Sequence, residues 1–174
     1  MAQTLEITLR NKLNTTKPAK RTKRAGRVVL LGVGSDLRGD DAAGMLVASS
    51  LQKIVSSPGL KRRLKVLFGA TAPENLTSEI RRFKATHVII VDAALMGAKP
   101  GAVEVIEPDR IEGVTFTTHQ LPMSIIARYL VHEVGCEVIF IGIQPKILKF
   151  GKPVSRELRS SAPKLARLIK KVLS

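Results

Sequence analysis

The feature that most constrains the fold is an alternation of short apolar runs with longer stretches of helical periodicity, which starts at Arg27. The apolar runs are too short for helices, and each is followed by a Gly or an acidic residue, as buried strands often are. They occupy residues 28–33, 64–68, 87–91, 102–106 and 137–141. Because helical patterns separate most of them, the sequence predicts an α/β fold, a three-layer αβα sandwich around a mostly parallel twisted sheet of about five strands.

The helical patterns support the same architecture. They cover residues 40–55, 73–83 and 121–134, and a C-terminal stretch carries an apolar stripe. Pro163 lies within this last stretch, so its helix either begins there or kinks there. Trp is absent and the apolar residues are mainly aliphatic, which is typical of parallel strands buried between helices.

The first 26 residues differ in character from the rest. Residues 14–25 are polar and basic, so we expect residues 1–26 to form a flexible, basic N-terminal arm and residues 27–174 to form a single domain. Residues 4–13 have some apolar periodicity and predict a short element within the arm. The formal net charge is +15, and much of it lies in the arm and near the C-terminus. We interpret it as solvation, because the basic segments lack the aromatic side chains on which nucleic-acid bases stack.

The cysteine content and the hydropathy limit the cellular location. Cys136 is the only cysteine, so the chain has no internal disulfide, as is usual in a reducing compartment. No apolar run approaches the roughly 18 residues that a membrane span needs. The basic N-terminus is not followed by the apolar stretch of a secretory signal. We therefore expect a cytoplasmic protein without membrane insertion.

Candidate chemical groups lie in loops after the strands, since ligands of doubly wound sheets bind beyond the carboxyl ends of the strands. The first loop has neither the third glycine of a dinucleotide fingerprint nor the Gly-Lys-Ser/Thr of a phosphate loop. It ends instead in Asp40 and Asp41. We assign Asp40 to capping the following helix and Asp41 to the site. Asp92 directly follows the third predicted strand, and His119 lies in a long loop before a helix.

Two carboxylates and one imidazole from three loops predict a metal-binding site. Imidazole suits nickel, zinc or iron, and carboxylates complete the coordination shell. Three protein ligands leave positions open for a group carried by the substrate. Each residue alone has a structural alternative, because Asp and His also occur as helix caps or in turns. Their separation along the sequence leaves their convergence to be tested by the structure.

Six segments, taken together and in order, carry a family resemblance. They are GVG and DD at residues 32–34 and 40–41, GATAPEN at 69–75, IVDA at 90–93, MG and PG at 96–101, THQLP at 118–122 and GIQP at 142–145. In these segments the chain resembles the nickel–iron hydrogenase maturation endopeptidases of the HycI/HybD type, and the HycI branch most. The resemblance covers essentially the whole predicted domain.

The resemblance implies a peptidase that removes a C-terminal extension from the precursor of a nickel–iron hydrogenase large subunit after nickel insertion. By position, Asp41, Asp92 and His119 match the residues that contact the metal in that family. The nickel would be borne by the substrate and not held stably by the free enzyme. Two alternatives stay open: a metallohydrolase with its own metal that acts on small molecules, and a nucleic-acid- or partner-binding module, which would leave the acidic cluster unexplained.

Overall fold

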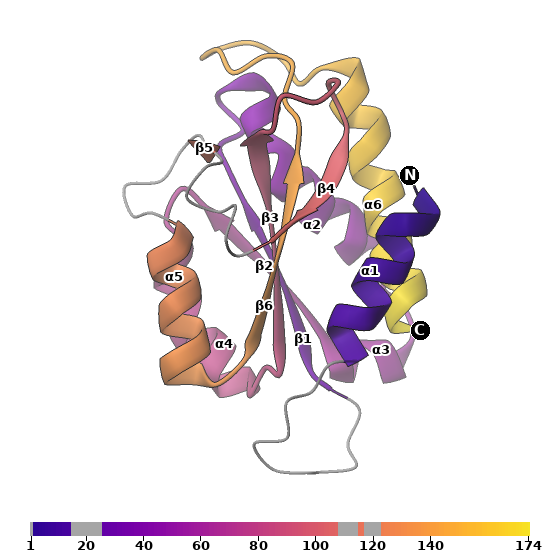
Figure 1. Cartoon of the computed structure of the whole chain (residues 1–174), viewed down its shortest axis with the longest axis vertical. Helices are drawn as coiled ribbons and strands as arrows, with labels where there is room; N and C mark the ends of the chain where they lie inside the picture. The colour runs from indigo at the N-terminus through magenta and orange to yellow at the C-terminus, as the bar shows by residue number, and fades with distance from the viewer. Residues whose placement is uncertain (1, 15–25, 108–114, 117–122) are drawn as a thin grey trace.

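A single twisted sheet with helices on both faces forms the centre of the molecule (Figure 1). The structure, a computed structural model, describes residues 2–14, 26–107, 115–116 and 123–174. The main strand order is β2 (Leu64–Ala70), β1 (Val28–Val33), β3 (His87–Leu95), β6 (Glu137–Ile143) and β4 (Val103–Ile106). The first four strands are parallel and β4 is antiparallel to β6. A two-residue strand, β5 (Thr115–Phe116), pairs antiparallel with the end of β3.

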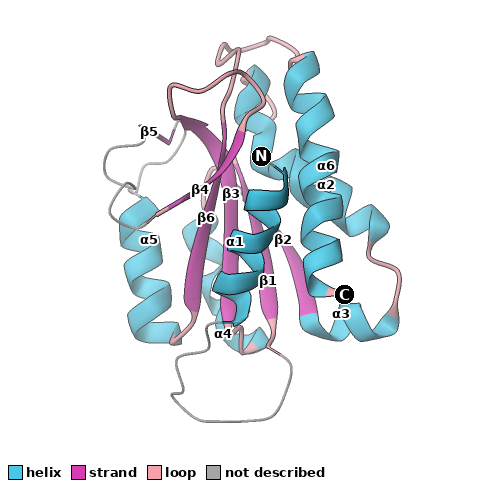
Figure 2. Ribbon diagram, turned by 45° about the vertical axis from the view of Figure 1, so that its right-hand side comes forward, coloured by secondary structure: helices cyan, strands magenta, loops and turns pink. Residues whose placement is uncertain are grey.

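Two layers of helices cover the sheet (Figure 2). One face packs against helices that share a core cluster with Leu30, Ile89 and Ile141; these are α1 (Ala2–Asn14), α2 (Ala43–Ile54), α3 (Pro58–Arg63) and α6 (Arg156–Leu173). The opposite face, with Val29 and Ile90, packs against α4 (Thr77–Phe83), α5 (Met123–Tyr129) and the π-helical turn η4 (Leu130–Val134). Short 3-10 turns, η1 (Gly39–Ala42) and η2 (Pro73–Leu76), lead into α2 and α4. The predicted αβα sandwich is therefore confirmed.

The structure shows where Pro163 lies in the C-terminal helix, which the sequence left open. Helix α6 begins at Arg156, where the side chain of Ser155 accepts a hydrogen bond from the Leu158 N–H at 3.2 Å. A serine in this position satisfies one of the N–H groups that have no partner at a helix start. Pro163 therefore lies inside the helix and not at its first residue.

The N-terminal segment contributes a helix to the packed structure. The short element expected at residues 4–13 is confirmed as α1, and its Leu9 is fully buried in the cluster that α6 also lines. An ion pair of 2.8 Å between Lys171 and Glu6 links the two helices. Residues 15–25 lie outside the described residues, so the division of the chain at residue 26 stays a prediction.

None of the helices in the described part of the chain combines the length and the apolar character needed to cross a bilayer.

Candidate active site

Helix α2 begins in direct backbone contact with the centre of the sheet. A Cβ atom added to Gly44 would lie only 2.0 Å from the carbonyl oxygen of Val91, and one added to Gly32 would lie 2.3 Å from the carbonyl oxygen of Gly44. Real side chains do not tolerate such distances, so glycine at both positions lets the helix touch β1 and β3. This contact brings η1, which precedes α2, to the carboxyl ends of the two strands.

Asp41 lies on η1 and is completely buried. Its Oδ2 atom accepts a hydrogen bond from the Ser35 N–H at 3.0 Å. Gly34, with φ of +123°, lies beside both Asp41 and Asp92: a Cβ atom at this position would be 1.8 Å from the Asp41 backbone carbonyl oxygen and 3.6 Å from Oδ1 of Asp92. The structure therefore brings the backbone of Asp41 and the carboxylate of Asp92 next to the same glycine.

Asp92 lies within β3 and not after it. The prediction that the strand ends at residue 91 is wrong, because the parallel pairing with β6 continues through Asp92 and Ala93, and β5 then pairs with Ala94. The side chain is 1 % exposed, and its Oδ1 accepts a hydrogen bond from the Ala93 N–H at 2.7 Å. Placement within a paired strand fixes the backbone of this carboxylate more firmly than a loop would.

Asp40 has a different role from the one assigned from the sequence. It caps neither η1 nor α2, since no side chain caps these helices. Its buried carboxylate instead accepts hydrogen bonds from the backbone N–H groups of Lys146 (2.8 Å), Ile147 (3.3 Å) and Ser155 (2.7 Å). Asp40 therefore fastens the segment between β6 and α6 to η1.

His119 lies outside the described residues. Within the residues that the structure does describe, no group of three His, Cys, Asp or Glu side chains is arranged to hold a metal ion. Two of the three predicted site residues, Asp41 and Asp92, are thus shown to be neighbours. The contact of His119 with them stays a prediction.

Gln144 is a positioning residue that the sequence reasoning did not single out. Its Oε1 atom accepts hydrogen bonds from the backbone N–H groups of Met96 at 2.8 Å and Ala98 at 3.2 Å. It thereby holds the loop that follows β3, the strand that carries Asp92. The only available signal was its occurrence in the GIQP segment, which did not indicate a contact with residues 96–98.

Cys136 does not supply a nucleophile. It is 3 % exposed, and its thiol donates a hydrogen bond to the Leu130 carbonyl oxygen at 3.4 Å. Burial raises the pKa of the thiol to about 11. Because the thiolate is the reactive form of cysteine, this residue belongs to the core.

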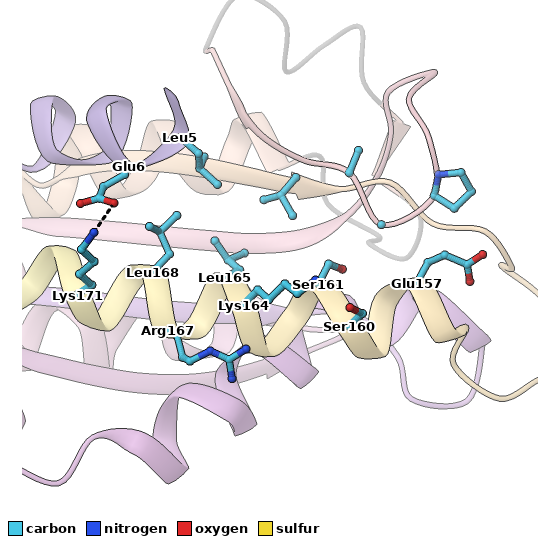
Figure 3. Close-up of a pocket in the computed structure, with 14 residues that line it drawn as sticks. Leu5, Glu6, Glu157, Ser160, Ser161, Lys164, Leu165, Arg167, Leu168 and Lys171 are labelled. Atoms are coloured by element: carbon cyan, nitrogen blue, oxygen red, sulfur yellow. Dashed lines mark hydrogen bonds and ion pairs between the residues drawn. The ribbon is translucent and has the colours of Figure 1, made fainter. Parts of the chain in front are cut away.

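A cavity of about 750 Å³ lies away from the acidic pair, between α1, α6 and the turn before β4 (Figure 3). Its apolar wall includes Leu5, Leu165 and Leu168. Its two acidic residues are paired: Lys171 beside Glu6 and Lys146 beside Glu157 lower the pKa of each carboxyl. Because both acids form ion pairs with lysines, this cavity is not an alternative to the Asp41 and Asp92 site.

Comparison with known proteins decides the family. The model of the HycI hydrogenase maturation protease family matches residues 45–172, well over half of the chain. The chain belongs to the hydrogenase maturation protease family. It is therefore a peptidase, as the resemblance in its six segments implied, and the mostly parallel sheet with helices on both faces agrees with solved members of that family.

Individual relatives agree with the family assignment. The hydrogenase 3 maturation protease of Escherichia coli K12 is 40 % identical over 134 residues, which are 76 % of this chain and 82 % of that protein. The crystal structure of the [NiFe] hydrogenase maturation protease HycI from Thermococcus kodakarensis superposes with a TM-score of 0.80 at 31 % identity and covers 95 % of this chain and 98 % of that chain. The HybD protease of T. kodakarensis, at 23 % identity, 85 % and 99 % coverage and a TM-score of 0.68, shares the fold.

Proposed function

We propose that this hydrogenase maturation protease removes the C-terminal extension of a nickel–iron hydrogenase large-subunit precursor, and that Asp41, Asp92 and His119 recognise the nickel that the precursor carries. The observation that carries the proposal is that two buried acidic residues, Asp41 and Asp92, both lie next to Gly34. Nickel is part of the substrate in this scheme. The proposal includes a cytoplasmic location for the reaction.

Each carboxylate is held in place before a substrate arrives. The Ser35 N–H binds Asp41 and the Ala93 N–H binds Asp92. Buried carboxylates in proteins are paired or bind cations, and carboxylate oxygens with an imidazole nitrogen match the preferences of a divalent first-row metal. Fixed ligands recognise a metal without a large cost for ordering side chains on binding.

The neighbouring strand pairing supports the inclusion of His119. Phe116 in β5 pairs with Ala94, two residues beyond Asp92. Three residues of chain span at most about 11 Å, so the position of His119 is tethered within that distance of Phe116. A connection of this length allows the proposed contact of His119 with the ion that the two carboxylates recognise.

Recognition of substrate-borne nickel would act as a checkpoint before hydrolysis. Contact with the nickel holds the scissile peptide bond beside Asp41, and orientation of reacting groups can lower a barrier by roughly 7–11 kcal/mol. In the proposed reaction Asp41 takes a proton from the attacking water. The water oxygen bonds to the peptide carbonyl carbon, the C–N bond breaks, and the proton passes to the amine that leaves.

The decisive experiment incubates the protein with nickel-loaded and nickel-free precursor and measures the product masses. We expect loss of a C-terminal fragment from the nickel-loaded precursor alone. Equal cleavage of both forms would refute the checkpoint, and cleavage of neither would refute the processing function. Stoichiometric metal in the purified protein before it meets the precursor would instead favour a metallohydrolase with its own ion.

Replacement of the three proposed nickel contacts tests their roles. Asp41→Ala, Asp92→Ala and His119→Ala should each abolish processing while circular dichroism and thermal melting show a folded protein. The control is Glu133→Ala, which removes an exposed acid on η4 and should process normally. Normal cleavage by Asp92→Ala would overturn the assignment.

A further inference from the structure

We propose that Leu37 and Phe150 form a docking tip that contacts an apolar, acidic surface of the precursor next to the cleavage site. This inference rests on the proposed function and adds a substrate-recognition surface to it. The two residues come from different loops at the carboxyl edge of the sheet, one after β1 and one in the segment between β6 and α6 (the orange loop at the top of Figure 1).

Both side chains expose apolar surface that the fold does not use. Phe150 is 72 % exposed and Leu37 is 59 % exposed, the two highest values among the large hydrophobic side chains of the described residues. Apolar surface is unfavourable in water and is stabilised when a partner buries it. An exposed Phe and Leu at neighbouring loop tips thus provide the apolar contact that a protein interface buries at its centre.

Phe150 projects from a defined turn and not from a loose loop. The Lys152 N–H donates to the Lys149 carbonyl oxygen at 3.2 Å, and Gly151 has a φ of +70°. This pattern is a β-turn with glycine at the position that needs a positive φ, and it places Phe150 at the corner before it. The Gly151 N–H donates in turn to the Leu37 carbonyl oxygen at 2.8 Å. The turn is therefore fastened to the loop that carries Leu37.

The same loop connects the tip to the proposed catalytic carboxylate. The Leu37 N–H donates to Oγ of Ser35 at 3.3 Å, and the Ser35 N–H donates to Oδ2 of Asp41 at 3.0 Å. On the other side, Asp40 binds the N–H groups of Lys146 and Ile147, which lead into the Phe150 turn. A partner that binds the tip is thus positioned relative to Asp41 through a short chain of hydrogen bonds.

The charges beside the tip indicate the chemistry of its partner. Three cations, Arg38, Lys149 and Lys152, and one acid, Asp36, lie within two sequence positions of Leu37 or Phe150, and none of the three cations forms an ion pair with another described residue. Cations beside an apolar centre complement an apolar surface that is rimmed by carboxylates. A second copy of this chain is disfavoured as the partner, because the formal net charge of +15 makes two copies repel each other.

The test compares steady-state processing of nickel-loaded precursor by the wild type and by a Leu37→Ala/Phe150→Ala double variant. We expect KM to rise roughly tenfold or more, as for truncation of a central interface contact, with kcat changed by less than about twofold. The matched control is Val131→Ala, which truncates a 46 % exposed apolar side chain in η4, just before β6 at the opposite end of the sheet. Its KM should equal that of the wild type.

A charge variant provides a second readout. Lys149→Glu should raise KM at low salt, and the difference should shrink as salt is added, because ions screen exposed charges. If the wild type processes the precursor but the double variant keeps the wild-type KM, the tip proposal is wrong while the proposed function stands. A dimer in sedimentation experiments that the double variant loses would also overturn it, in favour of self-association. Failure of the wild type to process the precursor would refute the proposed function itself.

Discussion

Removing the Asp40 carboxylate should destabilise the whole domain and not only the loop that it binds. The side chain is 1 % exposed and accepts three backbone N–H groups from a segment more than 100 positions later in the sequence. In Asp40→Ala these donors lose their acceptor; the bond to the Ser155 N–H is buried, and those to Lys146 and Ile147 are partly buried. Because an unsatisfied buried donor loses its full solvation, the effect exceeds the net contribution of an ordinary hydrogen bond.

The magnitude follows from the geometry. Two of the three bonds are short, at 2.7 and 2.8 Å, and the third is 3.3 Å. Hydrogen bonds to a charged group contribute about 1.5–3 kcal/mol each, so loss of the two short ones should lower the free energy of unfolding by about 3–6 kcal/mol. For a domain of this size, that corresponds to a fall of about 6–24 °C in Tm. Asp40→Asn, which keeps one acceptor oxygen, should lose about half as much.

Thermal melts followed by circular dichroism measure the effect, with urea unfolding as an independent check. Asp36→Ala is the matched control, since it removes an acid of the same loop that is exposed. It should melt with the wild type. A Tm of Asp40→Ala within about 3 °C of the wild type would refute the reasoning, as would an equal loss in Asp36→Ala.

Two further predictions concern the packing of α2 and a buried imidazole. Gly44→Ala should displace α2, because the added Cβ would lie 2.0 Å from the Val91 carbonyl oxygen. We expect urea unfolding to show a loss of about 1–3 kcal/mol in stability, and we expect slower processing of the precursor. Wild-type stability together with a wild-type processing rate would contradict the close contact. Burial lowers the pKa of His87 from its ordinary value of 6.5, against the opposing effect of Glu137. The unfolded chain therefore binds a proton near pH 6.5, whereas the folded chain takes it up only at lower pH. The free energy of unfolding should fall as the pH drops below about 6.5. In thermal melts at pH 5–8, His87→Gln should lose this part of the pH dependence.

The sequence predicted the layered architecture because that information is local. Apolar runs such as residues 28–33 and 87–91 identify their strands without knowledge of the rest of the chain. The rule that parallel strands place their carboxyl ends at one edge then brought Asp41 and Asp92 to the same region. Strand β5 was not predicted, because a strand of two residues is too short to show an apolar pattern.

The missing parts depend on contacts between distant segments. The partners of Asp40 are backbone N–H groups 106, 107 and 115 positions away. Every residue except proline has such a group, so no residue type in the partner segment indicates the contact. The role of Gly44 was equally invisible, because a glycine in a helix shows nothing about which strand backbone lies against it.

The two adjacent aspartates illustrate how a short turn separates two functions. In a 3-10 helix successive residues point about 120° apart, so neighbours on η1 face different parts of the molecule. Asp40 binds the backbone of the segment before α6, whereas Asp41 binds Ser35 and lies beside Gly34 and Asp92. The consequence can be measured: variants of Asp40 should lose stability first, and variants of Asp41 should lose processing while they remain folded. If both sets of variants lost stability equally, the two carboxylates would share a structural role and the catalytic assignment of Asp41 would lose its basis.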